Sequence, residues 1–266
     1  MPIDRRTPVI ILCGGQGTRI ADVSGNTIPK PLVRIGDKPV LWHIMKIYAS
    51  QGYENFILAL GHLGWAIKDY FLNEHLMDCD FRLTRSGAGL EIEMLDGASE
   101  TRWNIVFAET GPTTQTGMRL VRCSKYVDTD HFMATYGDGV ADIDIGALVR
   151  FAEATDRIGT VTSVTPASRF GNIETEGDIV SGFAEKTNAG GGAINGGFFV
   201  FKREFLDMAA KHGDVMLERG PLEELTVRGE LAAYRHEGFW EPMDTMREYK
   251  LLNDLWERGE AAWKRW

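Results

Sequence analysis

A glycine-rich loop near the start of the chain has the residue types of an anion-binding site. It comprises Gly14-Gly15-Gln16-Gly17-Thr18-Arg19. Glycines let a backbone approach a ligand closely and direct successive N–H groups at an anion, and the Arg19 guanidinium can form paired hydrogen bonds with a phosphate. The loop lacks the Gly-Lys-Ser/Thr of a Walker A motif, and Ile20 replaces the third glycine of a dinucleotide fingerprint. A tight strand-to-helix turn without a ligand is the alternative.

A lysine enclosed by two prolines follows about ten residues later. Pro29 and Pro31 keep the backbone around Lys30 extended and stiff, which restricts where the ammonium group can point. An isolated lysine is usually a solvated surface charge. Because this one is caged and close in sequence to the glycine-rich loop, Lys30 is a candidate phosphate contact.

Two acidic residues are candidate metal ligands. Asp138 lies between two glycines after an apolar run, and Asp244 lies in Phe239-Trp240-Glu241-Pro242-Met243-Asp244-Thr245. Carboxylate oxygens suit a hard cation such as Mg²⁺, which takes its other ligands from water and phosphate. The alternatives are a turn or helix cap at Asp138 and a helix N-cap at Asp244, and we expect Asp142 to cap the helix that starts at Ile143. Sequence alone does not bring the two candidate ligands together.

A fifth segment combines Phe183-Ala184-Glu185-Lys186 with Ala193-Ile194-Asn195-Gly196-Gly197. A carboxylate, an ammonium and an amide beside glycines suit sugar hydroxyls and a phosphate, although a β-turn region explains the segment equally well. Other chemistry lacks support: the histidines have no zinc-ligand spacing, the cysteines form no C-x-x-C pair, and no G-x-S-x-G nucleophile motif occurs.

The elements that must position these residues alternate between strand and helix. Short β-branched runs that end at glycine predict buried strands, and apolar residues at helical spacing predict helices. The first half of this pattern comprises strand Val9–Cys13, helix Pro39–Gln51, strand Phe56–Leu60, helix Trp65–Phe71 and strand Phe81–Leu83. We therefore predict an α/β fold with a mostly parallel, Rossmann-like sheet flanked by helices, whose strand-end loops share one edge.

The remainder of the chain continues this pattern less regularly. Further strands are expected at Leu90–Leu95, Asn104–Phe107, His131–Tyr136, Thr160–Val164 and Leu231–Tyr234. Further helices are expected at Thr116–Tyr126, Ile143–Ala154, Glu204–Ala210, Pro221–Val227 and Thr245–Trp256. Glycine-broken strands over residues 160–200 predict a small β-rich insertion in a single domain.

Composition limits the function classes. The 266 residues are 44% hydrophobic and 25% charged, with a formal net charge of −9, as in a soluble globular protein rather than a general nucleic-acid binder. The longest apolar run, Val9–Cys13, is far short of the roughly 20 residues that span a membrane, and no secretory signal is expected. Three scattered cysteines predict reduced thiols and a cytoplasmic location.

In their order along the chain, these segments resemble the sugar-1-phosphate nucleotidyltransferases (NDP-sugar pyrophosphorylases) from Val9 to Trp266. The glycine-rich loop is typical of the whole superfamily. Four other pieces resemble its cytidylyltransferase branch: Lys38-Pro39-Val40-Leu41-Trp42-His43-Ile44-Met45-Lys46, Tyr136-Gly137-Asp138-Gly139-Val140-Ala141-Asp142, Ile194-Asn195-Gly196-Gly197-Phe198-Phe199 and Gly238-Phe239-Trp240-Glu241-Pro242-Met243-Asp244-Thr245. The resemblance implies the nucleotidyltransferase type of α/β fold, with a nucleotide-binding part over about 1–158 and a sugar-binding and C-terminal part over about 159–266.

The resemblance also implies roles for particular residues. Asp138 and Asp244 would hold Mg²⁺, and the implied catalytic residues are Arg19, Lys30, Asp138 and Lys186. Nucleotide contacts are implied at Leu12, Gly14, Gly15, Gln16, Gly17, Thr18, Arg19, Lys30, Thr114, Arg119 and Asp138. Sugar-phosphate contacts are implied at Glu185, Lys186, Asn195 and Gly196.

The implied reaction is Mg²⁺-dependent, in-line transfer from CTP to a sugar 1-phosphate, most simply glucose 1-phosphate, giving CDP-glucose and pyrophosphate. A homo-oligomer, a trimer or hexamer, is also implied, with no nucleic-acid or membrane partner. Three positions depart from the family pattern: Ile28, Met118 and Thr187 replace a lysine, a glycine and a proline. Another nucleotide or phosphorylated acceptor, a nucleotide sensor and a metal-dependent glycosyltransferase remain alternatives.

Overall fold

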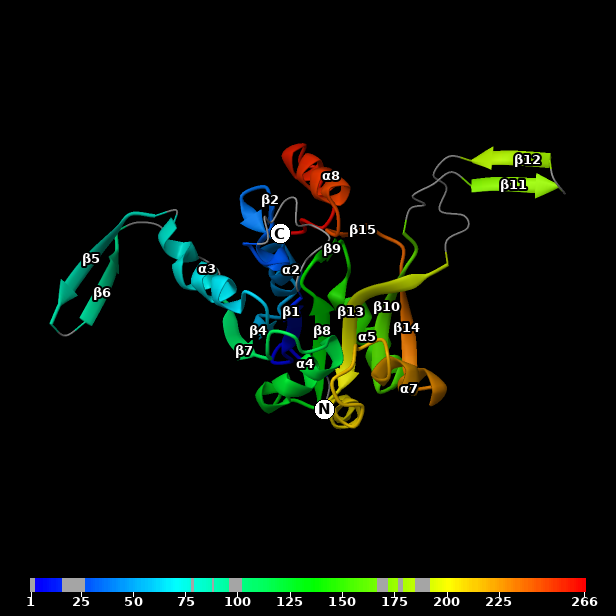
Figure 1. Cartoon of the computed structure of the whole chain (residues 1–266), viewed down its shortest axis with the longest axis horizontal. Coiled ribbons are helices and arrows are strands. Elements are labelled where there is room, and N and C mark those ends of the chain that lie inside the picture. Colours follow the sequence, from blue (N-terminus) through cyan, green and yellow to red (C-terminus); the bar gives the residue numbers. More distant parts are fainter. Residues whose placement is uncertain are drawn as a thin grey trace.

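The computed structural model describes residues 3–15, 27–77, 79–87, 89–95, 102–166, 172–176, 179–184 and 192–266. Its centre is a seven-stranded sheet in the order β14-β10-β13-β8-β1-β4-β7 (Figure 1). The strands are β1 (Val9–Cys13), β4 (Asn55–Leu60), β7 (Asn104–Glu109), β8 (His131–Tyr136), β10 (Gly159–Val164), β13 (Ile194–Lys202) and β14 (Leu231–His236). Only the pairings of β13 with β10 and β8 are antiparallel within this sheet, so the predicted mostly parallel α/β fold is confirmed.

Two apolar clusters cover the two faces of this sheet. The side chains of β1 alternate between them: Val9 and Ile11 belong to one cluster, whereas Ile10 and Leu12 belong to the other. All five β1 residues are buried, because strands covered on both faces need apolar side chains on both. Each such side chain contributes about 1.5–3 kcal/mol of burial free energy.

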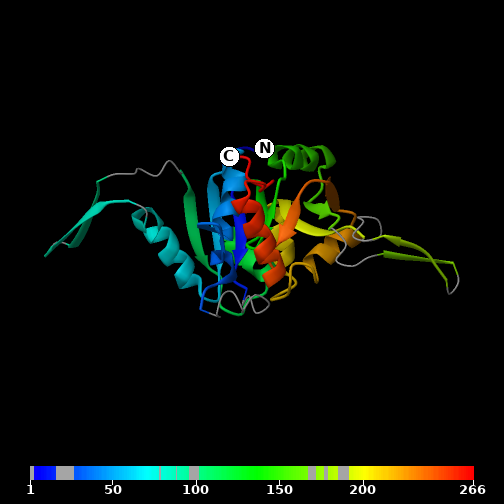
Figure 2. The same cartoon turned by 90° about the horizontal axis from the view of Figure 1, so that it is seen from above.

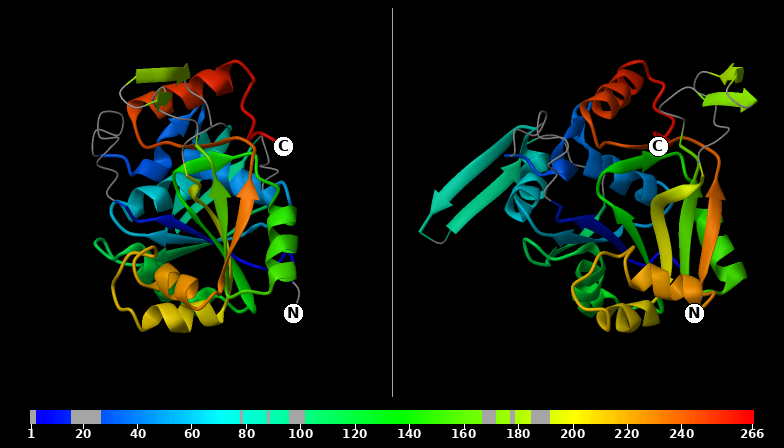
Figure 3. Two further views of the ribbon diagram at one scale, coloured as in Figure 1. Left: turned by 90° about the vertical axis from the view of Figure 1, so that its right-hand side faces the viewer. Right: turned by 45° about the vertical axis from the view of Figure 1, so that its right-hand side comes forward.

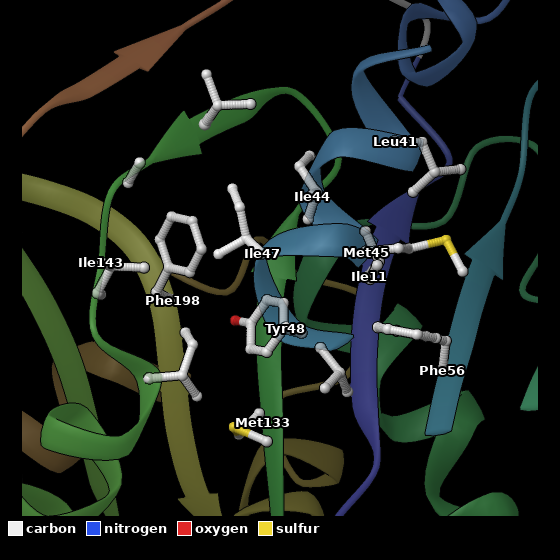
Figure 4. Packing of buried hydrophobic residues seen from close by; sticks show 14 of the residues in the cluster. Ile11, Leu41, Ile44, Met45, Ile47, Tyr48, Phe56, Met133, Ile143 and Phe198 are labelled. Carbon is white, nitrogen blue, oxygen red and sulfur yellow. The ribbon is translucent and has the colours of Figure 1, made fainter. Parts of the chain in front are cut away.

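Helices supply the other side of each cluster. The first cluster includes residues of α2 (Val40–Ala49), α5 (Ile145–Thr155) and α8 (Met246–Glu257), and Figure 4 shows Ile44 and Tyr48 of α2 beside Ile11, Met133 and Phe198. The second includes residues of α4 (Thr116–Cys123), α6 (Glu204–Ala210) and α7 (Pro221–Val227). Figure 3 shows α5 on the opposite side of the sheet from α6 and α7.

Short elements complete the body. A 3₁₀ turn, η2, spans Lys30–Leu32 and another, η3, spans Ser124–Tyr126. The two-residue strands β2 (Arg34–Ile35) and β3 (Lys38–Pro39) pair with each other, and β9 (Gly139–Ala141) pairs antiparallel with β15 (Trp240–Pro242). The last pairing brings together two candidate metal-binding segments that lie about a hundred residues apart.

Two hairpins extend from opposite ends of the molecule (Figures 1 and 2). One comprises β5 (Phe81–Ser86) and β6 (Gly89–Met94) and follows α3 (Gly64–Met77). The other comprises β11 (Asn172–Glu176) and β12 (Ile179–Ala184) and lies in the region where a β-rich insertion is predicted. The expected strand Phe81–Leu83 forms, but its expected place in the central sheet is wrong. The strand beside β4 is β7. Arg82 and Thr84 make one face of β5 too polar for a strand that is buried on both faces.

One predicted helix cap is also wrong. Helix α5 begins after Asp144, whose carboxylate accepts a hydrogen bond from the Ala147 N–H at 2.7 Å. Asp142 lies before this cap and approaches the His236 ring at 3.1 Å instead.

No described helix combines the length and apolar character needed to cross a membrane. Cys13 and Cys123 are buried free thiols.

Candidate active site

A cavity of about 630 Å³ lies where β1 and β8 end. Gly14 and Gly15 follow β1, and Gly137 and Asp138 follow β8, so the loops after these adjacent parallel strands meet at one edge of the sheet. The lining comprises Leu12, Cys13, Gly14, Gly15, Lys30, Pro31, Pro112, Thr113, Thr114, Gln115, Thr116, Arg119, Tyr136, Gly137, Asp138 and Asp244. The structure thus brings together eight of the predicted nucleotide and metal residues.

Lys30 enters the cavity from η2. This turn is closed by hydrogen bonds from the Leu32 N–H to the Pro29 carbonyl and from the Val33 N–H to the Lys30 carbonyl. The Lys30 side chain is 11% exposed, and its ammonium donates to Asp138 at 2.6 Å and to Asp244. Burial alone would lower the pKa of Lys30, but the two carboxylates outweigh it and raise this pKa above its ordinary value. Lys30 is therefore a fixed cation rather than a solvated surface charge.

The pairing of β9 with β15 holds the two carboxylates together. The Met243 N–H donates to the Asp138 carbonyl at 2.7 Å, which places Asp244 beside Asp138. The predicted alternative for Asp244, a helix N-cap, is wrong: Thr245 is the N-cap of α8. Glu248 accepts hydrogen bonds from the backbone N–H groups of Asp244 and Thr245, and the Asp244 carboxylate accepts one from Lys30.

The paired carboxylates fit a hard divalent cation. Both reach the same ammonium nitrogen, so their oxygens converge on one point. Among the residues that the structure describes, no cluster of three or more His, Cys, Asp or Glu side chains could form a metal cage. A small protein donor set of this kind suits Mg²⁺, which retains water and substrate phosphate as ligands.

Arg119 forms part of the cavity wall. Its guanidinium donates to the carbonyls of Gly14 (3.0 Å), Leu60 (3.0 Å) and Gly111 (2.9 Å), and to the Thr110 hydroxyl (2.7 Å). Burial lowers the pKa of Arg119. Arg119 therefore ties the ends of three loops together beside the cavity, a positioning role that the sequence pattern did not reveal.

Hydrogen bonds to α4 and to residues 214–217 hold the loop over residues 110–116 in place. Thr114 accepts a hydrogen bond from Arg122 at 2.8 Å, and Arg122 also donates to the Thr110 carbonyl. The Gln115 N–H donates to Asp214 at 2.8 Å, and the Thr116 hydroxyl accepts from the Leu217 N–H at 2.7 Å. Thr114 thus lines the cavity as expected, but its hydroxyl also has an internal partner.

A polar group missed by the sequence analysis, Glu218, contacts the cavity-lining residue Tyr136. The Tyr136 hydroxyl accepts from the Asn195 amide at 3.1 Å and donates to the Glu218 carboxylate. Burial raises the pKa of Tyr136, as does the Glu218 charge. Asn195, predicted from its motif, is thereby brought next to a cavity-lining ring. Gly196 lies beside it, and its carbonyl accepts from the Trp240 indole at 2.7 Å.

Known proteins resemble this chain in sequence over most of its length. The profile of the family described as "Nucleotidyl transferase" matches residues 8–241. The chain belongs to the nucleotidyl transferase family. It is 43% identical over 257 residues to a probable glucose-1-phosphate cytidylyltransferase of Bacillus subtilis, covering 97% of this chain and 99% of that protein. It is 41% identical over 262 residues to the glucose-1-phosphate cytidylyltransferase of Salmonella typhi, covering 97% of this chain and 98% of that protein.

Solved structures show the nucleotidyl transferase fold independently. HddC from Yersinia pseudotuberculosis superposes with a TM-score of 0.66 at 22% identity, covering 94% of this chain and 99% of that one. A UDP-glucose pyrophosphorylase in complex with UDP-glucose superposes with a TM-score of 0.68 at 14% identity, covering 96% and 99%. The predicted resemblance to nucleotidyltransferases is therefore confirmed for both sequence family and fold.

Several predicted site residues of this nucleotidyl transferase lie outside the described residues. They are Gln16, Gly17, Thr18 and Arg19 of the glycine-rich loop, and Glu185 and Lys186 of the sugar-phosphate segment. Their roles stay predictions.

Proposed function

We propose that this nucleotidyl transferase transfers a cytidylyl group from CTP to glucose 1-phosphate, giving CDP-glucose and pyrophosphate. The observation that carries the chemistry is the convergence of Lys30, Asp138 and Asp244 in a cavity bounded by the loop after β1. The choice of substrates is supported by 41–43% identity, over nearly the whole chain, to proteins named glucose-1-phosphate cytidylyltransferases.

The proposed step is a direct in-line displacement. An oxygen of the sugar phosphate attacks the α-phosphorus of CTP, the new P–O bond forms, and the bond to the β-phosphate breaks with release of pyrophosphate. A phosphate dianion is itself a nucleophile, so no general base or covalent intermediate is required. Catalysis then depends on aligning two anions and neutralising their charge.

The overall net charge of the chain is −9, so the positive charge that the reaction needs must be supplied locally at the site. Lys30 supplies a positive charge, because the neighbouring carboxylates of Asp138 and Asp244 raise its pKa and keep its ammonium group protonated. Asp138 and Asp244 would hold a divalent cation, Mg²⁺ in this proposal, which would neutralise charge on the nucleotide phosphates. Arg119 holds the Gly14 and Gly111 carbonyls in place and so fixes the shape of the nucleotide pocket.

Two further basic residues and both parts of the chain would take part in substrate binding. Arg19 and Lys186 would contact the phosphates of the nucleotide and the sugar. Residues of about 1–158 would bind mainly the nucleotide, and those of about 159–266 mainly the sugar. We also propose a cytoplasmic location, since free thiols such as Cys13 and Cys123 persist in reducing compartments. A homo-oligomer is proposed from the family resemblance alone.

The test is pyrophosphate release with Mg²⁺ across CTP, UTP, dTTP, ATP and GTP, each against a panel of sugar 1-phosphates. We expect release with CTP and glucose 1-phosphate, and loss of release with EDTA and in Asp138→Ala. Release with CTP and another acceptor would preserve the mechanism and change the substrate. Nucleotide binding without release from any pair would favour a sensor, and consumption of an NDP-sugar without pyrophosphate would favour a glycosyltransferase.

A further inference from the structure

The hydroxyl of Tyr136, at the end of β8, links two polar side chains beside the cavity. It donates its one hydrogen to the Glu218 carboxylate and accepts a hydrogen bond from the Asn195 amide at 3.1 Å. Burial and the Glu218 charge raise the pKa of Tyr136, so the phenol keeps this hydrogen at neutral pH. Because the Tyr136 ring lines the cavity, the chain Glu218–Tyr136–Asn195 lies against the space that substrates would fill.

The direction of these hydrogen bonds fixes which way the Asn195 amide faces. A carboxylate only accepts hydrogen bonds, so Tyr136 gives its hydrogen to Glu218 and can only accept from Asn195. The Asn195 NH₂ group therefore points toward Tyr136, and the amide oxygen accepts from the Gly197 N–H at 2.9 Å. Asn195 is exposed. Within the described part of the chain its second amide N–H has no partner, so it is open to a bound ligand.

Glu218 is held in a position that is unfavourable for folding. Its second carboxylate oxygen, Oε2, is buried and accepts no hydrogen bond from any described residue. A buried polar atom without a partner costs free energy, so its presence calls for an explanation. The backbone here is firmly fixed: the Leu217 N–H donates to the Thr116 hydroxyl at 2.7 Å, and the Gly117 N–H donates to the Val215 carbonyl at 3.1 Å. These contacts keep the carboxylate in place despite its unpaired oxygen.

The strand order separates this chain of hydrogen bonds from the loop after β1. Asp138 follows β8, and β8 lies between β1 and β13 in the central sheet (Figure 1). Gly14 and residues 110–116 line the cavity from the side of β1, β4 and β7, whereas Asn195 lies on β13. In the proposed function the nucleotide occupies the β1 side, so the β13 side receives the sugar phosphate.

We propose that Glu218 is a positioning residue for the sugar phosphate: through Tyr136 it fixes the Asn195 amide so that the second N–H donates to an oxygen of the sugar. This inference rests on the proposed function, which supplies that substrate. Without the Glu218 carboxylate, the Tyr136 hydroxyl is free to donate to the Asn195 oxygen, and the amide can turn over and present the wrong group to the sugar. Glu218 thus controls recognition of the sugar and not of the nucleotide.

The first test separates the two substrates kinetically. Tyr136→Phe and Glu218→Ala each break the chain, so each should raise the KM for the sugar phosphate roughly tenfold, about the value of one hydrogen bond, and leave the KM for the nucleotide unchanged. Glu218→Gln retains an oxygen that accepts from Tyr136 and should restore most of the loss. Because both residues act through one amide, the double variant should lose no more than either single variant.

The matched control is Glu223→Ala. Glu223 is exposed and accepts a hydrogen bond from the Gly220 N–H at 3.1 Å at the start of α7. Its loss should lower stability and leave both KM values unchanged. Circular dichroism and thermal unfolding of every variant separate loss of stability from loss of recognition.

The second test uses deoxy analogues of the sugar phosphate that the wild type accepts best. A different best substrate would therefore correct the proposed function without deciding against Glu218. In the wild type one analogue should lose roughly tenfold in kcat/KM relative to its parent, and Tyr136→Phe should accept the two equally. Unchanged sugar-phosphate KM in Tyr136→Phe and Glu218→Ala, an equal rise in both KM values, or the same discrimination among analogues in every variant would overturn the proposal.

Discussion

The ammonium nitrogen of Lys30 lies 2.6 Å from an oxygen of the Asp138 carboxylate, although 108 residues separate the two in sequence. The same nitrogen donates to Asp244, which lies on a third segment. Three segments thus place one cation and two carboxylates at a single point of the cavity. In the proposed mechanism, a divalent cation on the two carboxylates would act together with Lys30 to align the two phosphate-bearing substrates.

Replacing Lys30 should mainly reduce turnover. Lys30→Met removes the buried positive charge and leaves Asp138 and Asp244 facing each other, so we expect kcat to fall by about 10²–10³, the range measured for loss of a single charge-stabilising donor. Lys38→Met is the matched control, because Lys38 lies 3.6 Å from Glu74 and does not line the cavity. Steady-state pyrophosphate release with both substrates varied measures the effect. An unchanged kcat in Lys30→Met would remove Lys30 from the mechanism.

Replacing either carboxylate should raise the Mg²⁺ concentration that the enzyme needs for activity. Asp138→Asn and Asp244→Asn each remove one anionic oxygen ligand, so half-maximal activity should need a higher Mg²⁺ concentration, and chelation should abolish activity in every case. Titration of Mg²⁺ at saturating substrates measures this shift. In the control Asp144→Ala, loss of the α5 cap should lower the free energy of unfolding by about 0.5–2 kcal/mol without moving the Mg²⁺ midpoint. Identical midpoints in all variants would exclude both proposed ligands.

Two adjacent glycines should differ sharply in their tolerance of alanine. A Cβ atom on Gly14 would lie 2.1 Å from the Arg119 guanidinium carbon, whereas one on Gly15 would meet nothing within 4 Å. Because four hydrogen bonds hold that guanidinium, Gly14→Ala should displace it and lower the free energy of unfolding by about 1–3 kcal/mol. Gly15→Ala should leave it nearly unchanged. Urea denaturation of both variants measures the difference, and equal stabilities would show that Arg119 is not fixed by these contacts.

A buried histidine should make the fold sensitive to acid. Burial lowers the pKa of His43 to about 4, and its ring donates from Nε2 to the Ile35 carbonyl while Nδ1 accepts from Trp263. The unfolded chain takes up a proton near pH 6.5, but the folded chain does not. Stability is therefore full above about pH 6.5 and falls as the pH drops toward about 4, by about 3 kcal/mol from this group.

Urea denaturation across pH 4–8 measures this loss in the wild type. The variant His43→Gln retains an amide donor for Ile35 but has no group that titrates in this range. Its stability should vary less with pH between 6.5 and 4, even if its stability at pH 7 is lower. Parallel curves for the two proteins would show that His43 does not cause the acid sensitivity.

Much of this protein could be predicted from its sequence because the relevant signals are local. Continuous apolar runs such as Val9–Cys13 and His131–Tyr136 predict strands covered on both faces, and both strands form with these bounds. The glycines after β1 allow a tight turn and the prolines around Lys30 stiffen the backbone, so residue type alone made these segments candidates, and both line the cavity. Asp138 and Asp244 are recognisable as candidates because carboxylates suit a hard cation.

The tertiary structure decided what depends on contacts between distant segments. It paired β9 with β15, which turned two separate aspartates into one site around Lys30. It placed Arg119 between Gly14 and Gly111 as a support of the cavity wall, and Glu218 beside Tyr136. It also removed Phe81–Ser86 from the central sheet, because strand propensity determines local conformation but does not select a partner strand. Those partners are selected by the burial and hydrogen bonding of the whole chain, which no single segment contains.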